Sequence, residues 1–352
     1  MLGNYKSLAS KIQQRLDPEG LPTFQKALSD ELRSISYSDI LTYIKTAMQG
    51  VSEEYTKRSI EAGKKVEGHL RRKLVDVSYE FQGSVMTNTH IEGYSDIDLL
   101  VITEKSYSYD SYTTNRYIND PSLKLKLQSH QLQLLISEAE NTKYSGNQLQ
   151  DLREIRTDSE TVLTDTYDKC DTNQSKCITI YNKNLRKEVD TVIACWYDDL
   201  NSILNGKGTN RGIQIYHKHE HVKGNVDHPF LSIDLINQKS NLTNERLKKM
   251  IRFLKNVKSD SSLQIELSSF DLNAICYSID IYTYINSDFK ELIDILTRQL
   301  YTICNDDDFA NSIKSVTNQE YIFKDKSDKL ISARNLLSEV YSIYNDIHNV
   351  KQ

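Results

Sequence analysis

The stretch that decides the fold runs over residues 82–102 and reads QGSVMTNTHIEGYSDIDLLVI. It begins with Gly83-Ser84 after one apolar run and ends with an Asp-x-Asp motif, Asp96 and Asp98, at the start of another. A glycine and a serine let a backbone turn approach a phosphate group closely, and the serine hydroxyl adds a hydrogen bond. Side chains alternate along a strand, so the two aspartates point the same way. Two carboxylates beside a phosphate-binding turn predict a Mg²⁺ site for phosphoryl transfer.

Another carboxylate interrupts an apolar run later in the chain. Asp190 lies within an apolar, β-branched run over residues 187–196, which is typical of a buried strand. A buried carboxylate needs a cation or strong hydrogen-bond partners, and a metal shared with the first two aspartates would supply one. The alternative is a strand-end aspartate that caps a loop. Asp198 and Asp199 are rival candidates, but they follow the apolar run and do not interrupt it.

Composition limits the class of protein. A chain of 352 residues can bury a large core and form two lobes. Its net charge of −5, with 26% charged residues, does not indicate a generic basic nucleic-acid binder. No apolar run approaches the roughly 20 residues that span a bilayer, and the N-terminus shows no signal-peptide core. The five cysteines form no CxxC pair, so we expect reduced thiols in the cytoplasm and no structural zinc site.

Hydrophobic periodicity predicts a mixture of helices and strands. Residues 1–35 have a helical pattern that is broken near residues 17–22, and a long helical pattern over residues 38–73 is expected to form a spine beneath the sheet. Residues 124–136 fit either a strand or a helix, and the chain becomes mainly helical after residue 237. Strands are expected at residues 75–82, 97–103 and 188–196, with shorter strand-like runs at 212–216 and 230–236.

A basic helix is predicted after Thr243. Lys248, Arg252 and Lys255 follow at i, i+4 and i+7, which places three cations on one stripe. Such a stripe is usually a solvated face. In a protein that binds nucleoside triphosphates, one or two of these cations would neutralise the triphosphate tail.

The spacing of Gly83-Ser84 and the Asp-x-Asp motif resembles the signature of the DNA polymerase β-like nucleotidyltransferase superfamily. The long helix before this motif, the segment His228-Pro229-Phe230 and the helix with Arg252-Phe253-Leu254-Lys255 extend the likeness. Together they make nearly the whole chain similar to the bacterial cGAS/DncV-like nucleotidyltransferases, which start cyclic-oligonucleotide anti-phage signalling (CBASS). The resemblance implies an α+β fold. A polymerase β-like core, a mixed sheet with a long spine helix, would occupy residues 1–228, and a helical C-terminal lobe over residues 229–352 would close the nucleotide pocket.

The resemblance also implies a role for individual residues. Asp96, Asp98 and Asp190 would be the catalytic carboxylates and would hold two Mg²⁺ ions, which Mn²⁺ can replace. The acidic residue that the family carries soon after its aromatic step has no match, since Asp271 comes too early, so the base identity stays open. The expected nucleotide contacts are Gln82, Gly83, Ser84, Lys255, Ser268 or Ser269, and Phe270.

The implied function is a cyclic oligonucleotide synthase. Such a nucleotidyltransferase joins nucleoside triphosphates, ATP, GTP or pyrimidine nucleotides, into a cyclic di- or trinucleotide and releases pyrophosphate. A cyclic-nucleotide-activated effector would act downstream of the product, and neither a membrane nor a stable nucleic-acid partner is expected. The alternative is a linear-product nucleotidyltransferase acting on RNA, a protein or a small molecule, which would share all three carboxylates. A non-catalytic binding module is disfavoured, because such proteins typically lose a metal-binding carboxylate.

Overall fold

The computed structural model describes residues 4–16, 39–91, 97–141 and 144–349. The chain divides into two compact units. The helical unit comprises Met1–Thr56, Ser84–Ser95 and Leu235–Gln352, and the sheet unit comprises Lys57–Gly83 and Asp96–Asp234. These units group the N-terminal helices with the C-terminal ones, so they differ from the expected division at residues 228/229, which stays a prediction about functional domains.

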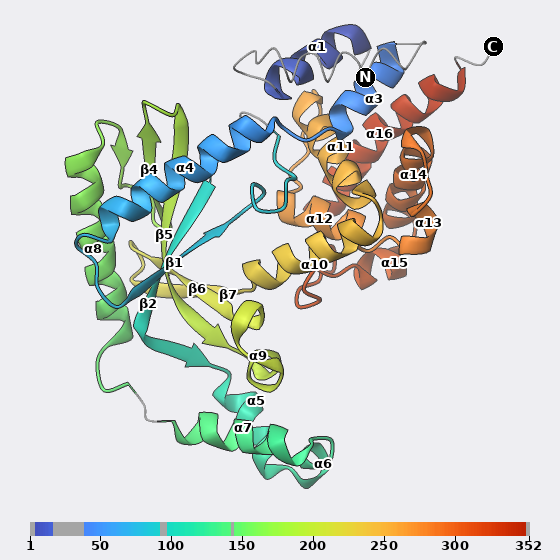
Figure 1. Ribbon diagram of the computed structural model, residues 1–352. Coiled ribbons are helices and arrows are strands. Elements are labelled where there is room, and N and C mark those ends of the chain that lie inside the picture. Colours follow the sequence, from blue (N-terminus) through green and yellow to red (C-terminus); the bar gives the residue numbers. More distant parts are fainter. Residues whose placement is uncertain (1–3, 17–38, 92–96, 142–143, 350–352) are drawn as a thin grey trace. The chain divides into compact units, whose positions relative to one another are not determined.

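Within the described residues, seven strands form one mixed sheet (Figure 1). Strands β2 and β5 run parallel at its centre, and every other pair is antiparallel. The order is β1-β2-β5-β4-β3, and β6 continues from the second half of β5 to β7. The strands are β1 Val77–Gln82, β2 Ile97–Tyr109, β3 Cys170–Asp171, β4 Cys177–Asn182, β5 Lys187–Asp198, β6 Gly212–His217 and β7 Val222–Asp227.

Helices of the sheet unit cover one face of this sheet. Helix α4 (Glu53–Leu70) passes so close to β1 that a Cβ on Gly63 would lie 2.5 Å from the Phe81 ring. Phe81 pairs with Leu99 of β2, so these side chains share the face that α4 covers. Helix α8 packs on β5, and the remaining helices follow β2 and β5 along the chain. They are α5 Ser111–Asn119, α6 Pro121–Lys124, α7 Ser129–Glu140, α8 Gln148–Thr166, α9 Leu200–Asn205 and a short 3₁₀ turn at Gly208–Asn210.

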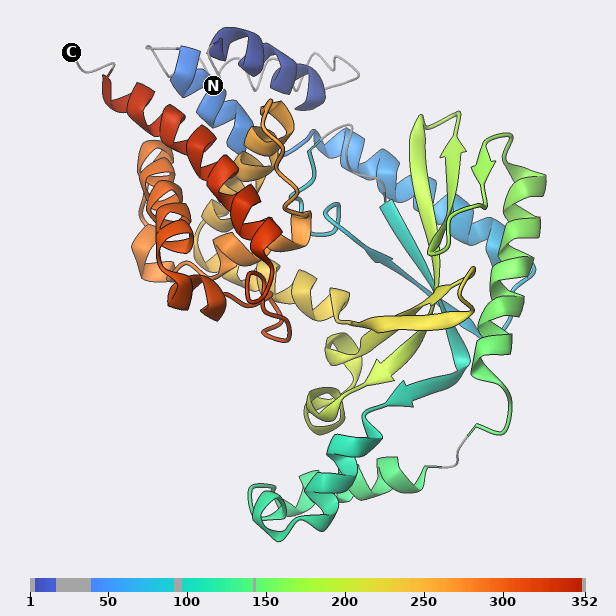
Figure 2. The same cartoon turned by 180° about the vertical axis from the view of Figure 1, so that it is seen from behind.

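The helical unit is built around one apolar core. Helix α1 packs on α3, α3 packs on α11, and α14 packs on α16 (Figure 2). Polar side chains fix several helix starts; for example, Asp288 and Glu291 form a capping box at α14. The elements are α1 Tyr5–Leu16, α3 Asp39–Met48, α10 Pro229–Leu242, α11 Arg246–Asp260, α12 Ser269–Tyr277, α13 Ile281–Tyr284, α14 Phe289–Asn305, α15 Asp307–Ser312 and α16 Ser327–Asn349. None of the helices in the described ranges combines the length and apolar character needed to cross a bilayer.

Most of the expected elements are confirmed, and two are corrected. The pattern over residues 38–73 forms two helices, α3 and α4, with a break after Met48. Ser52 caps α4, because its hydroxyl oxygen accepts a hydrogen bond from the Tyr55 amide. The run over residues 230–236 is helical, because Pro229 begins α10 and a short apolar run does not distinguish a strand from a helix. The ambiguous run near residue 130 is helix α7. The expected helix break at residues 17–22 lies outside the described residues.

Candidate active site

One row of paired positions crosses four neighbouring strands, β1, β2, β5 and β4. Gln82 pairs with Asp98, and Asp98 pairs with Asp190. Asp190 in turn pairs with Thr179. Paired residues point to the same face of a sheet, on strands about 5 Å apart. This carboxylate row (Gln82, Asp98, Asp190 and Thr179) therefore brings two of the expected catalytic carboxylates side by side, on the face that α4 does not cover.

Gly83 follows the row at the end of β1 and turns the chain beside Asp98. Its φ is +92°, a left-handed conformation that favours glycine. A Cβ at this position would lie 2.9 Å from Oδ2 of Asp98. The structure thus places the Gly-Ser turn against one of the two carboxylates of the Asp-x-Asp motif. The other, Asp96, lies outside the described residues.

Asp190 is held by a neighbouring hydroxyl group. Thr179 Oγ1 donates to Asp190 Oδ1 at 2.5 Å. Two residues before Thr179, burial raises the pKa of the Cys177 thiol, and the negative charges of Asp190 and Asp98 raise it further. The thiol therefore lies near both carboxylates, at the edge of an apolar cluster that includes Leu100. Asp190 stands within the strand and does not cap a loop.

The two rival aspartates have structural partners. Asp198 is fully buried and forms ion pairs with Arg211 and Lys207, both at 2.8 Å. Asp199 caps α9 by accepting from the Ser202 amide at 2.8 Å. Its pKa is lowered, in part by a hydrogen bond to a nearby histidine. These bonds account for both residues without a catalytic role.

The donor set of the row fits a hard divalent cation. Carboxylate and hydroxyl oxygens are the ligands that Mg²⁺ prefers, and two like charges on adjacent strands are unfavourable without a cation. Asp98 and Asp190 would supply two such ligands, and Asp96 would be the third. In the described part of the chain, which omits Asp96, no group of three His, Cys, Asp or Glu side chains is placed to hold a metal ion.

The loop after Gly83 is internally bonded. The carbonyl oxygen of Ser84 accepts from the Thr89 amide at 3.0 Å and from Thr87 Oγ1 at 3.2 Å. The hydroxyl groups of Thr87 and Thr89 lie 2.9 Å apart, and both residues are buried. Asn88 has a positive φ of 52°, which tightens the turn. The backbone of the expected phosphate-binding residue Ser84 is therefore fixed by two threonines.

The three cations of α11 are buried, so the usual interpretation of a solvated stripe is wrong. Lys255 Nζ donates to the Thr89 carbonyl at 3.0 Å, and burial lowers the pKa of Lys255 to about 7. Arg252 donates from Nε to the Met48 carbonyl at 2.8 Å and from Nη1 to the Asn88 carbonyl at 2.7 Å. Within the helical unit, α11 thus holds both the loop that begins at Ser84 and the end of α3. Lys248 is the third buried cation and lies 3.6 Å from Glu245.

The residues expected near the donor nucleotide begin helix α12. Ser268 caps this helix, because its Oγ accepts from the Asp271 amide at 3.2 Å and donates to the Asp271 carboxylate at 2.8 Å. Asp271 is buried and also pairs with Lys329 at 2.6 Å. Ser269 and Phe270 are exposed at the first turn. Of the two serines, Ser269 has the hydroxyl group that the cap does not use.

Sequence reasoning missed the residues that support the site. Thr179 lies in an ordinary β-branched run, and only strand register shows that it stands opposite Asp190. Thr87 and Arg252 act through hydrogen bonds to backbone atoms, which leave no sequence motif. The one available signal was the density of small hydroxyl residues just after Gly83.

The sheet, its parallel central pair and the Gly-Ser turn beside paired carboxylates define a nucleotidyltransferase fold, and comparison with known proteins agrees. Residues 64–179 match the nucleotidyltransferase domain, and residues 234–345 match the cGAS/DncV-like nucleotidyltransferase C-terminal helical domain. The chain is 46% identical to a c-di-GMP synthase of Capnocytophaga granulosa over 350 residues, which is 98% of each chain.

Solved structures give the same result. The STING-associated CdnE c-di-GMP synthase from Flavobacteriaceae sp. matches with a TM-score of 0.88 and 38% identity over 99% of both chains. Its counterpart from Capnocytophaga granulosa matches with a TM-score of 0.81 and 43% identity, again over 99% of both chains. The chain therefore belongs to the cGAS/DncV-like nucleotidyltransferases. The expected family, α+β fold, nucleotidyltransferase activity and cyclic-oligonucleotide signalling class are confirmed.

Proposed function

We propose that this enzyme joins two molecules of GTP into cyclic di-GMP, with release of pyrophosphate, as an anti-phage signal. Relatives that match almost the full chain at 46% and 38% identity are c-di-GMP synthases, which supports GTP as the substrate. The observation that supports the proposed nucleotidyl transfer is the carboxylate row beside the turn at Gly83. A linear-product nucleotidyltransferase would use the same carboxylates, so the product separates the two functions.

Asp98 and Asp190 of the row, together with Asp96, would hold two divalent cations, with Mg²⁺ as the natural ion and Mn²⁺ able to replace it. When bound, these cations lower the pKa of the attacking ribose hydroxyl and stabilise the charge of the transferred phosphoryl group and the pyrophosphate leaving group. Thr179 holds the Asp190 carboxylate by donating to Oδ1, which leaves Oδ2 for a cation. Asp190 is thereby kept in one orientation before the cation arrives.

The proposed nucleotide contacts include residues of each unit, and each group is considered within its own unit. In the sheet unit, Gln82 shares the face of Asp98, and Gly83 brings the backbone close to the carboxylate. Ser84 follows with a fixed backbone. In the helical unit, three residues stay proposed contacts, to the triphosphate or the base: Lys255, Ser269 in preference to Ser268, and Phe270. The burial of Lys255 supports this role, because a poorly hydrated ammonium gains more from a phosphate oxygen than an exposed one does.

The proposed partners are nucleoside triphosphates and, downstream, an effector that the cyclic product activates. The structural relatives are described as STING-associated, which supports a STING-type effector for this chain as well. Because nucleoside triphosphates are cytoplasmic metabolites, we propose that the reaction takes place in the cytoplasm. No stable complex with nucleic acid is proposed, in keeping with the net charge of −5.

Product analysis tests this function directly. The full chain is incubated with GTP, ATP or all four nucleoside triphosphates and Mg²⁺ or Mn²⁺, treated with phosphatase, and analysed by mass spectrometry. We expect cyclic di-GMP from GTP alone, resistant to phosphatase, and none from Asp190→Asn. Glu188→Gln is the matched control, because Glu188 is exposed two residues earlier on the same strand. A linear product with a phosphatase-sensitive end would overturn the cyclase, and a cyclic product from ATP alone would overturn the choice of guanine.

A further inference from the structure

One more strand is aligned with the carboxylate row. Asp171 of β3 pairs with Thr179, next to the β3–β4 turn at residues 172–176. Gln174 of this turn is exposed, and its Nε2 donates to Thr179 Oγ1 at 3.4 Å. Because Thr179 in turn donates to Asp190, Gln174 is bonded directly to the residue that holds the expected catalytic carboxylate.

The backbone of the β3–β4 turn is held from two sides. Arg156 of α8 is 1% exposed, and its Nη2 donates to the carbonyl oxygens of Gln174 and Cys177, both at 2.9 Å. From the β6–β7 hairpin, the Lys218 amide donates to the Ser175 carbonyl at 2.9 Å. Gln174 therefore stands on a fixed backbone, although its side chain is exposed.

The side-chain amide of Gln174 is oriented at both of its ends. The Cys177 thiol donates from Sγ to Oε1 at 3.2 Å, so the amide oxygen faces the thiol. On the other side, hydrogen bonds lower the pKa of Asp171, first from the Asn173 backbone amide and then from the Gln174 side chain. An ionised carboxylate only accepts, so this bond requires the amide nitrogen. A donor at one end and an acceptor at the other thus select the same orientation.

This orientation decides where the Thr179 proton points. A hydroxyl group has one proton and two lone pairs. The N–H group of Gln174 approaches one lone pair, which leaves the Thr179 proton for Asp190 Oδ1 at 2.5 Å. In the hydrogen-bond chain (Cys177, Gln174, Thr179 and Asp190), every donor therefore points toward the carboxylate. Hydrogen bonds that are aligned in this way polarise and strengthen one another.

We propose that Gln174 is a positioning residue for Asp190, acting through Thr179. This role rests on the proposed function, in which Asp190 holds a divalent cation. Partners that bond a metal-binding carboxylate fix its orientation and so raise the affinity for the metal. Without the Gln174 amide, the Thr179 hydroxyl is free to turn, and Asp190 loses part of its orientation before the cation binds. Gln174 itself need not contact the cation or the nucleotide.

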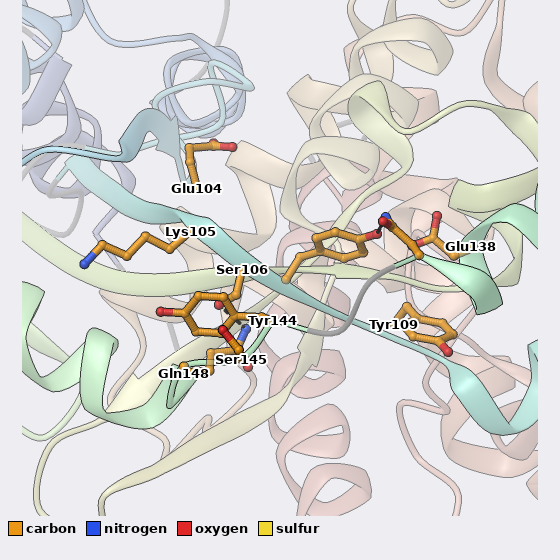
Figure 3. Close-up of a pocket in the computed structure, with 11 residues that line it drawn as sticks. Glu104, Lys105, Ser106, Tyr109, Glu138, Tyr144, Ser145 and Gln148 are labelled. Atoms are coloured by element: carbon orange, nitrogen blue, oxygen red, sulfur yellow. Dashed lines mark hydrogen bonds between the residues drawn. The ribbon is translucent and has the colours of Figure 1, made fainter.

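The hydrogen-bond chain is separate from a cavity at the second half of β2. This cavity has a volume of about 610 Å³ and includes the wall where β2 bulges, at residues 104–106, which have no partner on β5 (Figure 3). Its buried carboxylate, Glu138 of α7, pairs with Lys207 at 3.3 Å and is hydrogen-bonded to Tyr107. Gln174 does not line the cavity, so helix α7 offers a control position away from the row.

Mn²⁺ binding to the full chain, followed by electron paramagnetic resonance, tests the proposal without turnover. Gln174→Met removes the N–H donor at similar volume. It should raise the Mn²⁺ concentration for half-maximal binding by roughly two- to tenfold, the value of one neutral hydrogen bond. Gln133→Met is the matched control, because Gln133 is an exposed glutamine on α7. Both variants should unfold at the wild-type temperature, since neither side chain is part of a core.

A double-mutant cycle shows whether Gln174 acts through Thr179. Thr179→Val has no hydroxyl proton to direct, so adding Gln174→Met to it should leave Mn²⁺ binding unchanged. Additive losses in the double variant, wild-type binding by Gln174→Met, or an equal loss in Gln133→Met would each overturn the proposal.

Asp190→Asn separates failure of this proposal from failure of the proposed function. Wild-type Mn²⁺ binding and turnover in Asp190→Asn would overturn the assignment of the carboxylate row, and the role of Gln174 with it. Impaired Mn²⁺ binding in Asp190→Asn beside wild-type binding in Gln174→Met would overturn the role of Gln174 alone.

Discussion

The carboxylate row and the buried cations of α11 use charge in opposite ways. In the row, Asp98 and Asp190 occupy adjacent positions on parallel strands, an arrangement that becomes favourable when a cation joins them. In α11, Arg252 and Lys255 are buried and donate to backbone carbonyl groups of the same unit. We propose that the row keeps its charge available for a cation. In α11, Arg252 uses its charge to fix a loop, and Lys255, which donates to the same loop, is also a proposed triphosphate contact. Charged residues at regular spacing do not reveal which of these uses applies.

The largest effect should follow removal of charge from the row. Asp98→Ala or Asp190→Asn should lower nucleotide transfer by at least ~10³-fold, because phosphate charge in the transition state loses its cation. The fold should persist, since one of two neighbouring like charges is gone, and Asp190→Asn should still bind GTP. Steady-state rates and thermal unfolding measure both effects, with Glu188→Gln as the control. Wild-type rates in either variant would contradict the assignment of the row.

Loss of the Arg252 contacts should lower stability. Arg252→Met leaves the buried carbonyl oxygens of Met48 and Asn88 without their donor, which should lower the free energy of unfolding by about 2–4 kcal/mol. Urea unfolding measures the change, and Arg298→Met, at an exposed arginine on α14, is the control. If both variants unfold at the same urea concentration, Arg252 does not hold the loop.

A smaller effect tests whether Thr179 orients Asp190. Thr179→Val removes the donor to Asp190 Oδ1 at nearly constant volume, so it should raise the Mn²⁺ concentration for half-maximal binding and lower kcat/KM, each by about tenfold. Thr179→Ser keeps the hydroxyl group and should restore both. Mn²⁺ binding is followed by electron paramagnetic resonance, which reports the site without turnover. Equal Mn²⁺ binding by the valine and serine variants would rule out an orienting role.

The smallest effect concerns the proton of Lys255. Burial lowers its pKa to about 7 in the folded chain, from an ordinary value of 10.5. Between these values the unfolded chain binds a proton that the folded chain lacks, so stability rises with pH, by at most about 1.4 kcal/mol per pH unit from this group. In ligand-free protein, Lys255→Met should remove the contribution of Lys255 to the increase in the free energy of unfolding between pH 7 and 9.

Urea unfolding at three pH values measures this slope. Lys258→Met is the control for loss of a cation from the same helix, where Lys258 Nζ donates to the Leu267 carbonyl at 2.7 Å. A slope in Lys255→Met equal to that of the wild type would mean that the buried ammonium does not titrate in this range.

The sequence was sufficient for the parts of the site that depend on one strand at a time. Alternation predicted that Asp96 and Asp98 point the same way from one strand, and the interrupted apolar run singled out Asp190. The sequence alone could not show how the strands align, because register depends on contacts between distant segments. The position of Thr179 opposite Asp190 was therefore missed. The bulge at residues 104–106 is also a property of the pairing and has no local signal.

Helix positions show a similar limit. The apolar pattern over residues 38–73 keeps its helical period although the chain forms two helices, α3 and α4, and Ser52 caps the second. Pro229 begins a helix at a short apolar run that would also fit a strand. Burial of the α11 cations was not predictable, because their partners are backbone carbonyl groups more than a hundred residues away. The expected assignment of Asp96 lies outside the described residues and stays a prediction.

The alignment of four strands in one row limits how the length of this chain can change during evolution. Deleting one residue before Asp98 in β2 would turn its side chain to the face that α4 covers, and the same holds for Gln82 or Thr179 in their own strands. If the row is catalytic as proposed, we expect insertions and deletions within these strands to abolish activity and those beyond the strand ends to be tolerated. The segment between β2 and α8, which here carries α5, α6 and α7, lies outside these strands, so we expect changes in its length to leave the row undisturbed.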